Sequence, residues 1–191
     1  MGIPAESCSK PVAGNAPMAV VPIPLSRELL EAVLADQLSD RFVCELVWAR
    51  LGYQPPADTP PADLPLADPP LGAASPGADP APWSAGPATP SDWAAAFPTA
   101  PELIASRAAS VRLTRSIAAE SKQLLKQQLG FSGYRIGELY PRRTRRATAV
   151  NWLLADQARR GESLPASGPM PPLLPPPADP VQGHPGDLPV G

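Results

Sequence analysis

Residues 26–52, SRELLEAVLADQLSDRFVCELVWARLG, form a proline-free stretch in a chain where 30 of 191 residues are proline. Apolar side chains recur at helical spacing after Ser26 and again after Ser39, and both serines are suited to cap a helix N-terminus. Gly52 is suited to end the second helix. That helix is apolar around most of its circumference, which is typical of a central helix. The stretch predicts a helical pair over residues 26–54.

Most prolines outside this stretch gather in three segments, 1–25, 55–90 and 161–191. These segments have few large apolar side chains, so burial cannot offset the chain entropy lost on ordering them. We predict a disordered N-terminal arm, a disordered Pro/Ala-rich linker and a disordered Pro-rich tail. The remainder, 26–54 and 91–160, amounts to about 100 residues, enough for one hydrophobic core. We expect a mainly α fold, a single compact helical domain with a minor two-stranded element.

The local patterns after the linker predict several short elements. Thr99 and Glu102 have the spacing of a capping box, which indicates a short helix over 101–106. Alternation of apolar and polar residues predicts strands at 111–114 and 134–136. Apolar periodicity predicts two further helices, one over 117–129 between Ser116 and Gly130, and one over about 145–159 capped by Thr144.

The formal net charge of −2 hides a strong asymmetry along the chain. Between Glu102 and Arg160 there are twelve arginines and lysines and four acids, so the acids are concentrated outside this region. The densest basic cluster is PRRTRR at 141–146, at the predicted start of the last helix. These charges add to the positive end of the helix dipole, which is unfavourable unless a negative group lies nearby. The candidate anion-binding or partner-binding residues are Arg142, Arg143, Arg145 and Arg146.

This arginine cluster has two interpretations. Guanidinium groups and unpaired helix N–H groups together can hold a phosphate, a nucleic-acid backbone or an acidic patch on a protein. The same arginines can instead be solvated or paired with acids inside the fold. Trp152 lies on a helix flank away from Val150 and Leu154, which makes it a candidate partner-facing aromatic residue.

Motifs for catalysis are missing from the sequence. The single histidine, His184, lies in the Pro-rich tail, so a Ser/His/Asp or Cys/His arrangement would need the tail to fold back. The two cysteines, Cys8 and Cys44, form no Cys/His metal motif. Cys44 falls within a helical pattern, which indicates a core thiol. The sequence predicts a protein that is not an enzyme and that has no metal or cofactor.

Four stretches resemble a small cyanobacterial protein family catalogued as a domain of unknown function. They are FVCELVWARLGY at 42–53 and IASRAASVRLTRSI, KQLLKQQLGFSGYRIGE and PRRTRRATAVNWLLA within 93–155. The resemblance implies a cyanobacterial, cytoplasmic protein. It implies no activity, cofactor or catalytic residue.

We therefore expect a non-enzymatic binding or adaptor protein whose arginine-rich helix start docks an acidic protein partner. The alternative is an RNA-binding or DNA-binding protein that uses the same arginines on the phosphate backbone. No stretch approaches the roughly 20 apolar residues of a membrane helix, and the first ten residues lack the apolar core of a signal peptide. These features predict a cytoplasmic protein and leave its oligomeric state open.

Overall fold

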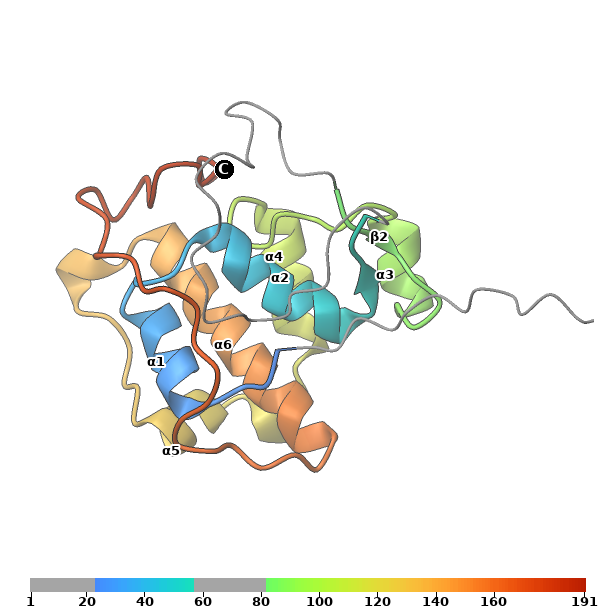
Figure 1. The fold of residues 1–191 in the computed structure, drawn as a ribbon, viewed down its shortest axis with the longest axis horizontal. Helices are drawn as coiled ribbons and strands as arrows, with labels where there is room; N and C mark the ends of the chain where they lie inside the picture. Colours follow the sequence, from blue (N-terminus) through green and yellow to red (C-terminus); the bar gives the residue numbers. More distant parts are fainter. Residues whose placement is uncertain (1–22, 57–81) are drawn as a thin grey trace, which may run out of the picture.

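The computed structural model of the protein describes residues 23–56 and 82–191, which form six α-helices and one two-stranded antiparallel sheet (Figure 1). The predicted mainly α fold with a minor two-stranded element is confirmed. The predicted N-terminal arm and linker lie mostly outside the described residues.

The first two helices follow the capping signals in the sequence. Helix α1 spans Arg27–Leu34, and the Ser26 hydroxyl accepts a hydrogen bond from the Leu29 amide at 3.2 Å. Helix α2 spans Asp40–Leu51, and the Ser39 hydroxyl accepts from the Phe42 amide at 3.2 Å. Gly52 ends α2 in the left-handed conformation with φ +83°, where a Cβ atom would come within 2.6 Å of the Ala88 carbonyl carbon. The position therefore requires glycine.

The small sheet lies elsewhere than predicted. Strand β1, Tyr53–Gln54, pairs antiparallel with β2, Ser84–Ala85, and Tyr53 faces Ala85. Strand β2 lies at the end of the segment predicted to be a disordered linker. The Tyr53 hydroxyl donates to the Phe97 carbonyl at 2.8 Å and so links β1 to the C-terminal end of helix α3, Ser91–Ala96.

The strands predicted at 111–114 and 134–136 are wrong. Residues 107–116 form helix α4, Arg107–Ser116, whose N-terminus is capped by the Ser106 hydroxyl. Leu113 is buried whereas Val111 is 38% exposed, so the two side chains lie on different faces and do not alternate as in a strand. Residues 136–138 form a 3-10 turn, Ile136–Glu138.

Two predicted helices also differ from the structure. Glu102 accepts a hydrogen bond from Arg41 at 3.2 Å instead of completing a capping box, and residues 103–105 form a turn. The Ser116 hydroxyl donates to the Leu113 carbonyl and accepts from the Trp152 indole, so it does not cap a helix. The chain forms a 3-10 turn, Ala119–Ser121, before the short helix α5, Leu124–Leu129. The predicted Gly130 C-cap is confirmed, with φ +67°.

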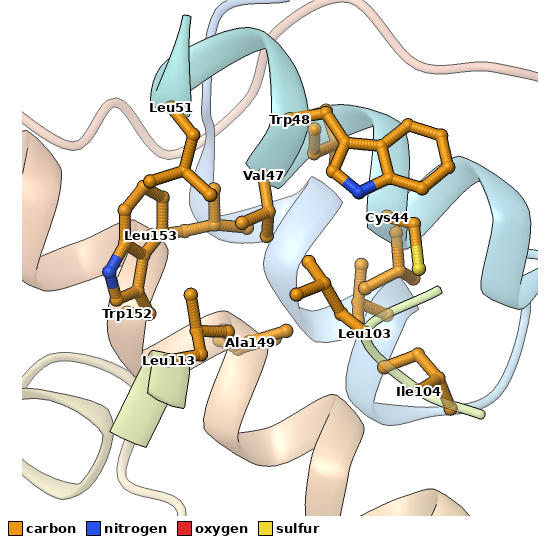
Figure 2. Packing of buried hydrophobic residues seen from close by; sticks show 14 of the residues in the cluster. Cys44, Val47, Trp48, Leu51, Leu103, Ile104, Leu113, Ala149, Trp152 and Leu153 are labelled. Atoms are coloured by element: carbon orange, nitrogen blue, oxygen red, sulfur yellow. The ribbon is translucent and has the colours of Figure 1, made fainter. Parts of the chain in front are cut away.

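Helix α6, Pro141–Arg159, takes the central position that the sequence suggested for α2. It lies against α1, α2, α4 and α5, and α3, Ser91–Ala96, packs beyond α4 (Figure 1). Side chains from α2, the 103–104 turn, α4 and α6 meet in one core (Figure 2). Cys44 is fully buried there, and burial raises the pKa of its thiol, as expected of a core residue.

The Pro-rich tail, predicted to be disordered, instead runs back along the helices (Figure 1). The carbonyls of Pro165 and Ala166 accept from the amides of Arg27 and Glu28 at 2.9 and 3.1 Å, and the Leu174 amide donates to Gln37. A proline-rich segment has carbonyl acceptors even where it lacks N–H donors, and the first turn of α1 has N–H groups without helical partners. Hydrogen bonds to the helical domain therefore hold the tail in place, although the tail has no hydrophobic core of its own.

Candidate functional site

Helix α6 begins one turn earlier than the sequence pattern indicated. Pro141 is its first residue, and Thr144 lies within the first turn, where its hydroxyl donates to the Tyr140 carbonyl at 3.1 Å. Proline suits this position because its missing N–H would have no helical partner. The earlier start places Arg142 and Arg146 one turn apart on the inner face of the helix.

Two aspartates from the α1–α2 region meet these inward arginines. The Arg142 guanidinium donates to Asp36 at 2.8 Å through Nη1 and to Asp40 at 2.7 Å through Nε. Arg146 also pairs with Asp40 and donates to the carbonyls of Val33 and Leu38. Asp36 adopts a left-handed backbone with φ +59°, which only a few residue types tolerate. This strained turn is held in place by the ion pairs that its carboxylate makes.

Arg143 joins the same network from its edge. Its Nε donates to the second Asp36 oxygen at 3.0 Å, and its guanidinium lies over the Tyr134 ring at 5.7 Å. Burial raises the pKa of Tyr134 to about 12. Burial alone would lower the pKa of Arg142, but hydrogen bonding to Asp40 and the charges of Asp36 and Asp187 raise it. Arg142 is therefore stabilised as a buried cation, and Arg143 pairs with Asp36 from a partly exposed position.

The structure corrects the roles predicted for three residues. Arg142 and Arg146 are 1% and 0% exposed, so neither lies on the surface of this fold while the tail is in place. Trp152 is 7% exposed, and its indole Nε1 donates to the Ser116 hydroxyl at 2.9 Å. Figure 2 shows Trp152 among the core side chains. The internal pairing that the sequence left open as an alternative is the arrangement that forms.

Arg145 is the member of the cluster that turns toward α4. Its guanidinium donates to the carbonyls of Ile104 and Ala105 at 2.8 and 2.7 Å and to that of Gly191 at 2.6 Å. Burial and the nearby charge of Arg107 lower the pKa of Arg145. Neither Arg107 nor Arg145 forms an ion pair with an Asp or Glu side chain among the described residues.

A groove of about 360 Å³ runs between α4 and α6 beside these two arginines. Its walls carry hydroxyl groups from both helices and two exposed apolar side chains, Val111 and Leu139. The lining residues are Arg107, Ser110, Val111, Thr114, Leu139, Pro141, Thr144, Arg145 and Thr148.

A second hollow, about 410 Å³, lies between α3 and α4. Val111 lines both hollows, and Arg115 lines the second together with Trp93, Phe97 and Arg112. Arg112 is paired with Asp92 at 2.9 Å, whereas Arg107 and Arg115 form no ion pair with a described residue. Helix α4 contains no acid, so its outer face is a basic surface with an apolar centre.

We call Arg107, Val111, Arg115 and Arg145 the α4 surface. Sequence reasoning missed three of its four residues because it assigned part of this stretch to a strand. Read as a helix, residues 107, 111 and 115 are spaced four apart and therefore form one stripe. That spacing was the available signal.

The described residues give no indication of a membrane span or a metal site. No helix within 23–56 and 82–191 has the length and apolar character needed to cross a bilayer. In the same ranges, no three His, Cys, Asp or Glu side chains are arranged to hold a metal ion.

The model of the Domain of unknown function (DUF1823) matches residues 24–158. The chain belongs to this family. A structure solved by solution NMR matches with 40% sequence identity and a TM-score of 0.52, over 73% of this chain and 98% of the other. No curated protein matches.

The DUF1823 domain contains α1 to α6, apart from the last residue of α6. It therefore includes the α4 surface and the pairs that Arg142 and Arg146 make with Asp36 and Asp40. Residues 159–191, including Asp187 and Gly191, lie beyond the matched range. The tail lies beyond the matched range and contacts three arginines of the DUF1823 domain, Arg50 through Glu162, Arg142 through Asp187 and Arg145 through Gly191.

Proposed function

We propose that this protein is a non-enzymatic binding or adaptor protein whose α4 surface docks an acidic segment of a protein partner. The observation that carries the proposal is that Arg107 and Arg145 line one groove and that neither forms an ion pair with a described Asp or Glu side chain. Like charges placed together are unfavourable alone and become favourable when an anion binds between them. We also place the protein in the cytoplasm of a cyanobacterium, as the sequence and its resemblance suggest.

The shape and chemistry of the α4 surface suit a peptide. Val111 lies between Arg107 and Arg115 and between the two hollows, so an apolar side chain flanked by acids would match this order. The hydroxyls of Thr114 and Thr144 line the groove and can bond to peptide carbonyls or carboxylates. Charge complementarity of this kind speeds association and selects the partner.

Nucleic acid fits this surface less well. Binding of single strands usually combines basic residues with exposed aromatic rings on which bases stack. The aromatic residue nearest Arg112 is Trp93, which is 2% exposed, and Trp152 is also buried. Nucleic acid remains the alternative ligand, and the experiment below distinguishes it.

The test measures fluorescence anisotropy of two labelled probes with the full chain. One probe is a glutamate-rich peptide with a single leucine, and the other is a single-stranded oligonucleotide of equal charge. The double variant Arg107→Ala/Arg115→Ala should bind the peptide roughly tenfold more weakly at low salt. The control Lys122→Ala/Lys126→Ala removes the same charge from exposed positions near α5 and should bind normally.

The outcomes separate the hypotheses clearly. Peptide binding that is lost in the arginine variant and kept in the lysine variant supports the proposal. Preferential binding of the oligonucleotide, with a steep salt dependence, would replace it by the nucleic-acid alternative. If the wild-type protein and the variant Gly183→Ala, which we expect to release the tail, both fail to bind the peptide, the proposal is wrong.

A further inference from the structure

The carboxylate of Asp187, in the tail, occupies a buried site on the domain. Its Oδ1 accepts from the Asp40 amide at the start of α2 at 2.8 Å. Its Oδ2 accepts from Arg142 Nη2 at 3.1 Å and from the His184 amide at 2.7 Å. The Asp187 side chain is 1% exposed. A helix N-terminus and a buried guanidinium together make a strong site for an anion.

The charges of the domain explain why this site attracts a carboxylate. Arg142, Arg143 and Arg146 are paired with Asp36 and Asp40 inside the DUF1823 domain. Three cations thus face two anions, and the missing negative charge comes from outside the family-matched range. The domain by itself carries an anion site, and in this chain the tail fills it.

The tail fits closely against Arg142. Gly183 has φ +88°, and a Cβ atom there would lie 2.6 Å from Arg142 Nε and 2.5 Å from Asp187 Oδ2. His184 is buried beside them, with Nε2 at 3.2 Å from the Pro175 carbonyl and Nδ1 at 3.4 Å from Asp187 Oδ2. The Nδ1 atom makes no hydrogen bond to a described residue. This segment is therefore shaped to place one carboxylate on Arg142.

The end of the same segment reaches the α4 surface. The Gly191 carbonyl accepts from Arg145 Nη2 at 2.6 Å, and the Gly191 amide donates to the Ala105 carbonyl at 3.2 Å. Arg145 is the arginine that shares the groove with Arg107. A single segment of nine residues, 183–191, thus places a carboxylate on Arg142 and also accepts a hydrogen bond from Arg145, which lines the groove between α4 and α6.

We propose that residues 183–191 act as an internal ligand that competes with an acidic segment of a partner for these arginines. The inference rests on the proposed function, because the partner's carboxylates would use the donors that Asp187 and Gly191 now occupy. Release of the tail uncovers Arg142, frees the Asp40 amide and returns an Arg145 donor to the groove. The tail therefore sets the affinity of the site, and a partner that binds must displace it.

The experiment compares Gly183→Ala with Gly186→Ala in the full chain. Both glycines have positive φ, +88° and +93°, so alanine introduces similar backbone strain at each. A Cβ at Gly183 collides with Arg142, whereas a Cβ at Gly186 meets no atom within 4 Å. Only the first substitution should drive Asp187 out of its site.

Two measurements are made on each variant. Hydrogen exchange of the Asp40 amide, followed by NMR, reports whether Asp187 is docked. Anisotropy with the glutamate-rich peptide reports the affinity. Gly183→Ala should speed exchange at Asp40 and tighten peptide binding at least about fivefold, because the competent population increases. Gly186→Ala should leave both close to the wild-type values.

The possible results distinguish this inference from the proposed function. Faster exchange in Gly183→Ala with unchanged peptide affinity overturns the competition, while the proposed function stands. Exchange at Asp40 that is equally fast in the wild type shows that the tail does not occupy the site and also overturns the inference. Absence of peptide binding in every variant overturns both proposals.

Discussion

Helix α4 and the first two turns of α6 are both rich in arginine, but they use these residues in opposite ways. Arg142 and Arg146 on α6 are buried and paired with aspartates, whereas Arg107 and Arg115 on α4 are exposed and make no ion pair with a described residue. The acid that pairs with Arg142 through Nε lies 102 residues earlier in the chain. Local charge density therefore does not decide whether an arginine is buried in an ion pair or left on the surface, whereas the positions of distant acids do.

Loss of a buried arginine should give the largest effect. Arg146→Ala leaves Asp40 short of a partner and removes the donors to the carbonyls of Val33 and Leu38. We expect a decrease of about 3–5 kcal/mol in the free energy of unfolding, because a buried charge then lacks compensation. Urea unfolding followed by circular dichroism measures it. Arg107→Ala is the matched control and should change the value by less than about 0.5 kcal/mol.

Removal of the tail carboxylate should have a smaller effect. Asp187→Asn keeps the side-chain shape but removes the charge that faces Arg142. The expected loss is about 1.5–3 kcal/mol, the range for hydrogen bonds to charged groups, since Arg142 keeps Asp36 and Asp40. Asp179→Asn removes the same charge from an exposed tail position and serves as the control in urea unfolding. Equal values for both variants would show that the tail carboxylate contributes nothing specific.

Loss of the hydrogen bond between Trp152 on α6 and the Ser116 hydroxyl should lower the free energy of unfolding by a smaller amount. Ser116→Ala leaves the indole Nε1 of Trp152 without its acceptor. We expect a loss of about 1 kcal/mol, the low end for an unpaired donor, because Ser116 lies at the surface where water can approach. Thr148→Ala removes a hydroxyl that bonds only the Thr144 carbonyl of its own helix and should be nearly neutral. A neutral Ser116→Ala would indicate that Trp152 is less firmly held than the hydrogen bond implies.

The sequence predicted the parts of this fold that depend on local signals. The caps at Ser26, Ser39, Gly52 and Gly130 form as expected because each signal acts within one helical turn. The helix that starts at Ser106 was missed because Val111 and Leu113, two residues apart, imitate strand alternation. The packing of Leu113 against the core decides in favour of the helix, and packing is not visible in a short window of sequence.

The sequence indicates that the candidate site is rich in arginine, but it does not indicate which of these arginines are buried and which are exposed. An arginine-rich stretch without nearby acids indicates unusual electrostatics around the start of α6. Because no acid is close in sequence, the pattern favours a helix start at Thr144, which avoids burying a charge. Asp36 and Asp40 remove that objection, and Asp187 from the tail completes the balance. Which residues stay exposed could be decided only after these three distant carboxylates were located.

The smallest effect on stability is expected at Arg115, on the exposed face of α4. Arg115 lies in the last turn of α4, and it forms no ion pair with a described residue. Its replacement by alanine should change the free energy of unfolding by less than about 0.5 kcal/mol. It should nevertheless weaken binding of the glutamate-rich peptide and reduce the dependence of that binding on salt, because exposed charges act through a field that ions screen. Anisotropy titrations over a series of salt concentrations, with Lys126→Ala as the control, measure this. A salt dependence identical to that of the wild type would mean that the peptide does not contact Arg115. The exposed arginines of α4 would then be solvated side chains without a binding role.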